Sequence, residues 1–199
     1  MSSIFSDPFF RRGTTLLGGE TIEVDGSNKP IAGTEIVGQV KVFQDAVPTG
    51  MGERRSNRLV YCVAARYKGS NVTDASTLAG EVFAFDATAP LTEFATSNAK
   101  ATAANANSGL MLGVLDEYLT GSLRANDIVW LVVKGPTSIK QTAAAINAGV
   151  AVHVSGTAGS VSAAAGAGAS TVAIGQQIAG SNSAAAVGLT RVNLMSNYV

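Results

Sequence analysis

The sequence is poor in charge, in cysteine and in histidine, and each shortage excludes a class of function. Asp, Glu, Lys and Arg make up 14% of its 199 residues, against about 25% in an average soluble domain. The single cysteine, Cys62, excludes an intramolecular disulfide framework. One cysteine and one histidine do not supply the ligands of a structural zinc site, and no EF-hand spacing of acidic residues occurs. We therefore expect no metal ion and no other cofactor.

Neither sign of charge dominates, and long apolar runs are missing. The 14 basic and 14 acidic side chains balance, and they form no basic stripe of the kind that binds nucleic acid, so we expect no nucleic-acid partner. No apolar segment approaches the ~20 residues that span a bilayer, which predicts that the chain does not enter membranes. The N-terminus has no charged segment followed by an apolar one, so we expect no secretory signal.

Catalytic groups are equally scarce. The only histidine, His153, lies in the alternating run VAVHV, and Cys62 lies in the apolar run RLVYCVAARY. We expect both side chains to be buried in strands, because the neighbours of each are apolar and strand-like. Free cysteine is also among the most buried residue types. A Cys62–His153 nucleophilic pair would also need an orienting residue and an oxyanion hole. The sequence predicts a protein that is not an enzyme and has no catalytic residues, with a small Cys/His hydrolase as the enzymatic alternative.

The distribution of charge predicts self-association. Residues 141–199 contain one charged residue, Arg191, among many alanines and glycines. A surface built from such a segment is poorly solvated when it is exposed to water. Packing against another protein surface is therefore favoured. We expect much of this surface to be covered by identical subunits.

The pattern that is present is one of short β-strands joined by glycine turns. It predicts an all-β fold, an antiparallel β-sandwich or barrel-like domain. The run DIVWLVV holds the only tryptophan, Trp130, and indicates a strand buried on both faces that ends at Gly135-Pro136. The neutral stretch VSGTAGSVSAAAGAGAS (154–170) is interpreted as a small-residue hairpin or loop between strands. Strands are expected at residues 20–24, 34–43, 59–67, 81–85, 110–115, 127–133, 150–154, 171–175 and 186–194, and a short helix or a loop at 98–107.

The first residues indicate an extended N-terminal arm. We divide the chain into an arm, residues 1–13, and a β-rich domain, residues 14–199, with two β subdomains, 14–97 and 108–199, as the alternative. The arm is rich in aromatic and basic residues, and residues 48–57 form a charged loop that is either solvated or a contact patch. Alternatively, the phenylalanines of the arm fold back on the protein's own core. The candidate partner-binding residues are Phe5, Phe9, Phe10, Arg11, Arg12, Arg54 and Arg55.

The C-terminal part carries a family resemblance. The three segments that carry it are ANDIVWLVVKGPTSI, AAINAGVAVHVSGTAGSVSAA and VAIGQQIAGSNSAAAVGLTRVNLM. Their features are Asn126-Asp127, Gly135-Pro136, the turn Ser155 to Gly159, Ile174-Gly175 and the terminal Arg191 to Leu194. In this pattern of strands and small-residue turns, roughly residues 110–195 resemble the head decoration (cement) proteins of tailed bacteriophages.

The resemblance implies a function that the composition does not show by itself. Decoration proteins are β-rich and commonly trimeric, and they clamp neighbouring major capsid subunits on the outer surface of the shell. It implies that this chain is made in the host cytoplasm, forms a homotrimer, and becomes part of the virion at the capsid surface. The major capsid protein is its implied partner. Another virion subunit, of the tail tube or the capsid, is the structural alternative. Such a subunit is expected to have a long helix and a large extended loop, and the sequence indicates neither.

Overall fold

The computed structural model describes the greater part of the chain. It covers residues 37–44, 59–86, 88, 95–115, 122–142, 146–163, 168–178 and 189–194. The predicted strand at 20–24 and the loop at 48–57 lie outside these ranges, and so does the predicted arm, residues 1–13. The arm and the division into domains therefore stay predictions.

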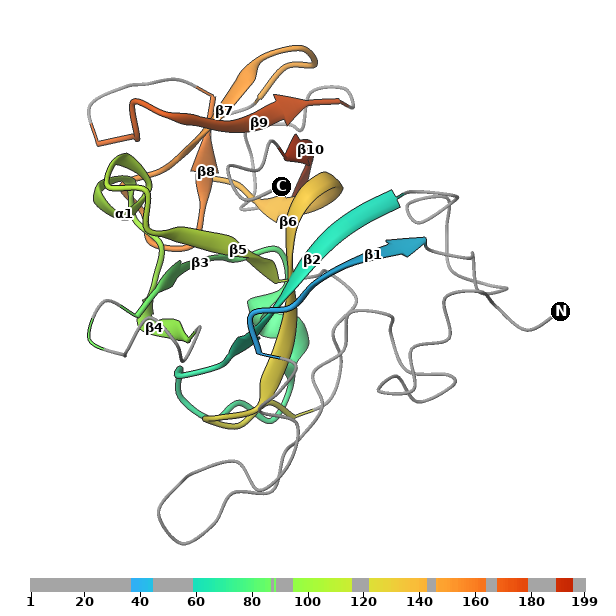
Figure 1. Ribbon diagram of the computed structural model, residues 1–199. Coiled ribbons are helices and arrows are strands. Elements are labelled where there is room, and N and C mark those ends of the chain that lie inside the picture. The colour runs from blue at the N-terminus through green and yellow to red at the C-terminus, as the bar shows by residue number, and fades with distance from the viewer. Residues whose placement is uncertain are drawn as a thin grey trace, which may run out of the picture.

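The described chain is built from ten strands, one short 3-10 helix and one short α-helix (Figure 1). Every ladder between the strands is antiparallel, which confirms the predicted all-β, antiparallel class. The elements are β1 (Val40–Gln44), β2 (Leu59–Arg66), η3 (Ala75–Leu78), β3 (Val82–Phe85), β4 (Thr96–Lys100), α1 (Ala103–Asn107), β5 (Met111–Leu115), β6 (Ile128–Lys140), β7 (Ala151–Val154), β8 (Val161–Ser162), β9 (Ala173–Gln177) and β10 (Leu189–Leu194). Within the described ranges, no helix combines the length and the apolar character that crossing a bilayer requires.

Strand β6, with 13 residues, belongs to both sheets of the fold. Its first half pairs with β2 on one side and β5 on the other, and β3, β4 and β1 complete this sheet. Its second half pairs with β10, which continues through β9 and β7 to β8. Strands β7, β8 and β9 therefore lie at one end of the molecule and β1 and β2 along one side (Figure 1).

Strands β2 and β6 are buried on both faces because two separate cores lie against them. One core contains Trp130 and the other contains Leu131, its neighbour in the sequence. Side chains of a strand alternate between the faces of a sheet, so a strand between two cores is apolar at every position. Trp130 is 3% exposed, and residues 128–133 are all buried. The prediction of a doubly buried central strand is confirmed.

The predicted end of this strand at Gly135-Pro136 is wrong. Strand β6 continues through both residues to Lys140. Gly135 has φ 105, a conformation that glycine adopts without the strain of a Cβ, and the chain changes sheets at this point. On β6, the ladder with β2 extends as far as Lys134 and the ladder with β5 as far as Val132. At Pro136, β10 is therefore the one described strand that pairs with β6. Proline is compatible with a strand where one edge needs no N–H donor.

Two other boundaries differ from the prediction. The strand expected at 34–43 begins at Val40, because Val37 and Gly38 form a turn in which Gly38 has φ 82. Residues 98–107, expected as one helix or loop, divide into the end of β4 and the helix α1. The helix begins where the Asn105 side chain accepts hydrogen bonds from the Thr102 amide and hydroxyl, at 2.9 and 2.8 Å.

The small-residue stretch at 154–170 contains the turn between β7 and β8 and all of β8, in agreement with the predicted hairpin or loop. Its turn closes where the Ser155 amide donates to the Ser160 carbonyl at 2.9 Å. Gly159 lies at φ 77, and a Cβ on it would stand 2.8 Å from Cδ of Lys100. The Gly159 amide donates to Ala101, and its carbonyl accepts from Val82. The small residue therefore lets the hairpin approach β3 and β4 at backbone distance.

Candidate protein-interaction surface

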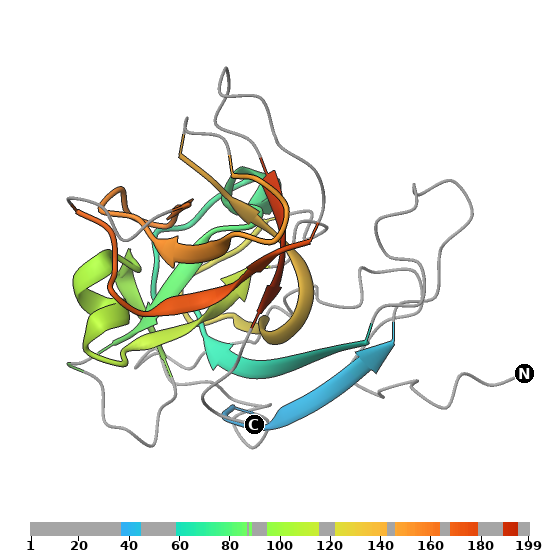
Figure 2. The same ribbon diagram turned by 90° about the horizontal axis from the view of Figure 1, so that it is seen from above.

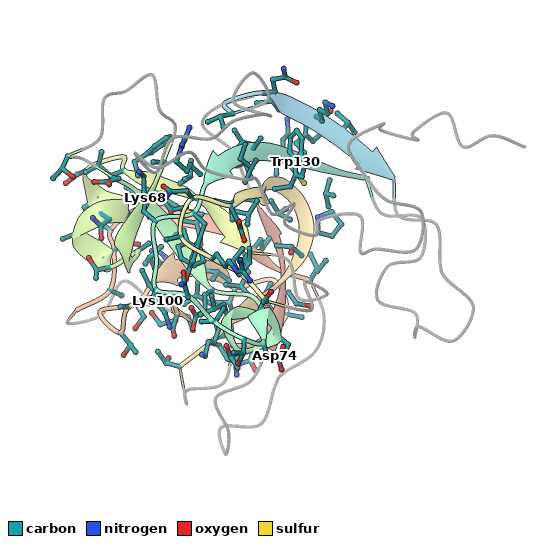
Figure 3. All side chains as sticks on the ribbon, turned by 90° about the horizontal axis from the view of Figure 1, so that it is seen from below. Lys68, Asp74, Lys100 and Trp130 are labelled. Carbon is teal, nitrogen blue, oxygen red and sulfur yellow. The ribbon has the colours of Figure 1, made fainter. Side chains whose placement is uncertain are left out.

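Strand β1 presents its apolar side chains outward and its lysine inward. Val40 and Val42 are 45% and 39% exposed. Lys41 lies on the opposite face, with its ammonium 5.4 Å from the centroid of the Trp130 ring. Figure 3 shows Trp130 beside β1 and β2. This is the reverse of a half-buried strand in solution, where the apolar face normally meets the core and the polar face meets water.

The outward face of β1 continues onto β2 through the sheet register and reaches β6 through a side-chain contact. Val42 is opposite Tyr61 on β2, and Tyr61 is opposite Lys134 on β6. The Lys134 ammonium lies 5.0 Å from the centroid of the Tyr61 ring, a cation–π contact. Val42 and Tyr61 form a cross-strand row on this face. The β2–β6 register shifts between Tyr61 and Cys62, and it is the contact with the Tyr61 ring that brings the Lys134 ammonium to this row. We call Val40, Val42, Tyr61 and Lys134 the β1 face.

The β1 face has the chemistry of a protein-binding surface. Strand β1 lies at the outside of the sheet next to β2 in both views (Figures 1 and 2). Val40 is opposite Val63, which is 3% exposed and belongs to the second core, so the exposed valines continue that core at the surface. Valine, a partly buried tyrosine and a lysine offer apolar area, an aromatic anchor and a positive charge.

A second cluster of charge lies elsewhere in the fold and joins its two halves. The carboxylate of Glu81, 1% exposed, accepts hydrogen bonds at Oε1 from Lys100 at 2.6 Å and Lys140 at 2.9 Å. Glu81 precedes β3, while the lysines end β4 and β6, so one oxygen links three strands. Lys100 and Trp130 are well separated in Figure 3, so this cluster is distinct from the β1 face. Both lysines are about a third exposed, and the buried carboxylate holds them in place.

Tyr67 lies within the electrostatic reach of this cluster. Its hydroxyl donates to the Ser70 carbonyl at 3.0 Å, and its ring meets Phe83 edge-on. Burial raises the pKa of the Tyr67 phenol above its ordinary 10.0, and the negative charge of Glu81 raises it further. Both effects disfavour the phenolate, because they remove it from water and place it near a like charge.

We expect the stability that Tyr67 contributes to be lost at alkaline pH. The folded state keeps the phenol proton at a pH where the unfolded chain has released it. Stability is therefore unaffected below about pH 10 and falls as the pH rises from there through the folded pKa. Absorbance titration should show a tyrosinate transition above the usual range, and Tyr67→Phe should remove it. If Tyr67→Phe instead removes a transition at or below pH 10, this prediction is contradicted.

The two residues of the enzymatic alternative are both buried in strands, as predicted. Cys62 is fully buried on β2. His153 is 9% exposed on β7, and its Nδ1 lies 2.8 Å from the Ser170 carbonyl oxygen. A carbonyl only accepts, so Nδ1 carries the proton and the imidazole is held by the backbone. In the part of the chain that the structure covers, no three His, Cys, Asp or Glu side chains gather as a metal site would require.

The candidate residues from the sequence and the surface found in the structure do not coincide. The predicted partner-binding residues lie outside the described residues, and they stay a prediction: Phe5, Phe9, Phe10, Arg11, Arg12, Arg54 and Arg55. Sequence reasoning missed the β1 face. The alternation of residues 40–42 indicated that the two valines share a face, but an isolated strand gives no sign that this face points outward.

Comparisons with known proteins supply no relative for this chain. No family model matches it, and neither does any curated protein or solved structure. The function therefore has to be inferred from the β1 face and from the pattern of strands and small-residue turns in residues 110–195.

Proposed function

We propose that this chain is a structural protein of a tailed-bacteriophage virion that binds the outside of the capsid and bridges neighbouring major capsid subunits. The observation that carries the binding role is the β1 face, where two valines are exposed while the lysine between them points inward. Such a strand suits an assembly in which a partner covers the valines. The resemblance of residues 110–195 suggests the assembly, a phage shell that the protein joins after synthesis in the host cytoplasm.

We propose further that the protein acts as a homotrimer. Apart from Arg191, residues 141–199 are uncharged, and two exposed apolar side chains of this segment flank β9. These are Val172 and Ile178, which are 43% and 46% exposed. An apolar surface with little charge is suited to contact between subunits. An oligomer also binds the capsid through several copies of the same contact, so that contacts which are weak one by one give strong binding together.

Capsids of the encoding phage, assembled without this protein, provide the test. Purified protein added to them should co-sediment at a saturating ratio, and the decorated shells should resist heat or denaturant better than bare shells. Light scattering across a dilution series should give the mass of a trimer. Protein that stays in the supernatant at micromolar concentration would refute the capsid role, and a stable monomer of 20.1 kDa at every concentration would refute the trimer.

A variant that lacks residues 2–12 tests the predicted arm. If the arm docks on the shell, the truncated protein should melt at the wild-type temperature and bind capsids more weakly. Burial of each phenylalanine contributes roughly 1.5–3 kcal/mol, offset in part by the cost of ordering the arm. Equal binding would exclude the arm as an anchor. A much lower melting temperature would instead place the phenylalanines in the protein's own core.

A further inference from the structure

We infer that the β1 face is the surface that contacts the capsid, and that it binds a partner segment in which a carboxylate stands beside apolar side chains. This inference rests on the proposed function, and it names the chemistry of the partner at that same surface. It follows from three observations: the apolar area of the face, the lysine within it, and a second lysine on the opposite side of β1 that protects the edge of the strand.

The apolar part of the face is continuous. Val40 and Val42 are two residues apart on one strand, so their side chains are neighbours on the same face. The half-buried Tyr61 ring lies beside Val42 in the next strand, and behind Val40 the row continues into buried Val63. Single exposed apolar residues are common on protein surfaces, but here they form one area with an aromatic side chain and a core behind it.

The charged part of the face is a lysine placed for a carboxylate. The ammonium of Lys134 is held over the Tyr61 ring, and among the described residues no carboxylate lies within ion-pair distance of it. Lys100 and Lys140, by contrast, share the carboxylate of Glu81. An ammonium has three N–H donors, and a contact with a ring leaves them available to an acceptor. An acidic residue of the partner is therefore the complement that this position favours.

Lys41 favours docking on the face over addition of a strand at the edge. In the described sheet β1 pairs only with β2, and its inward side chain is a lysine over Trp130. Inward-pointing charges at the outer strand of a sheet disfavour edge-to-edge pairing, since a strand added there would have to bury the charge. A partner that lies across Val40 and Val42 leaves Lys41 undisturbed.

The experiment measures the binding of variants to capsids of the encoding phage that lack this protein. Val40→Ser/Val42→Ser should weaken binding about tenfold or more, as expected for the loss of two buried valines. Lys134→Gln should weaken it about fivefold and flatten its salt dependence, Lys134→Glu should weaken it further, and Lys134→Arg should retain it. The matched controls are Ala104→Ser, an exposed position on α1, and Arg124→Gln, an exposed cation; both should bind like wild type. Melting temperatures verify that each variant is folded.

Each outcome bears on one proposal. If wild-type protein does not bind the capsids, the proposed function fails. If wild type binds and the β1-face variants bind equally well, the function stands and this inference fails. If Val40→Ser/Val42→Ser lowers the mass measured by light scattering, the face is a contact between copies of this chain and the inference is overturned. Binding that Lys134→Glu leaves unchanged or strengthens would overturn the acidic character of the partner.

Discussion

Replacing Trp130 with alanine is expected to lower the free energy of unfolding by about 3–5 kcal/mol. The indole lies in the core that β2 and β6 share and is 3% exposed. Its direct neighbour across the ladder is Ala64, a small residue that cannot fill the space left by the indole. The substitution also removes the ring beneath the Lys41 ammonium, a contact worth about 0.5–1 kcal/mol.

Chemical denaturation followed by circular dichroism measures this loss, because Trp130 is the only tryptophan and the variant has no indole fluorescence. Thr73→Ala is the control, since Thr73 is exposed and lies outside both cores. Its effect should stay within about 0.5 kcal/mol. A denaturation midpoint for Trp130→Ala equal to that of wild type would mean that the indole is at the surface, and the assignment of β6 as a doubly buried strand would then be wrong.

The double substitution Lys100→Met/Lys140→Met is expected to cost a similar amount, about 3–5 kcal/mol. It leaves the carboxylate of Glu81, 1% exposed, without a cation. The second oxygen, Oε2, is buried and accepts no hydrogen bond, so it does not offset the loss. Each single substitution should cost less, about 1.5–3 kcal/mol, since the other lysine still donates to Oε1.

A triple variant separates the buried charge from simple packing. Adding Glu81→Gln to the double substitution removes the charge while keeping nearly the same shape, so most of the lost stability should return. If the triple variant is no more stable than the double, the loss came from the packing of the lysine stems, Lys100 against Gly159 included. A double variant as stable as wild type would show that water reaches Glu81 and that the cluster does not join the sheets.

Much of the fold could be predicted where the signal is local. β2, β3, β5 and β7 lie within one or two residues of their predicted ranges, because each is a short apolar or alternating run with a turn signal nearby. The end of β6 could not be predicted. Gly-Pro normally stops a strand, and it continues here only because β10 arrives from more than fifty residues away, Pro136 facing Asn193.

The candidate site was less predictable than the fold. The alternation in β1 defines two faces, yet Val40 and Val42 become surface residues only because β2 and β6 place Trp130 on the other side, where Lys41 covers it. The position of Lys134 over Tyr61 likewise depends on the register between β2 and β6. A shift of one residue in the β1–β2 ladder would exchange the faces of β1, and the position of Lys134 depends on the register shift that β2 and β6 show between Tyr61 and Cys62.

The sequence by itself determined the all-β class, the burial of Trp130, Cys62 and His153, and the hairpin in the small-residue stretch. These properties follow from side-chain size and polarity over a few neighbouring residues, which are the same in any sheet that the chain forms. Only the tertiary structure decided which face of β1 points outward and which lysines meet Glu81. Lys100 and Lys140 are 19 and 59 residues from Glu81 in the chain. Strand order and register brought them together, and no short stretch of sequence encodes either.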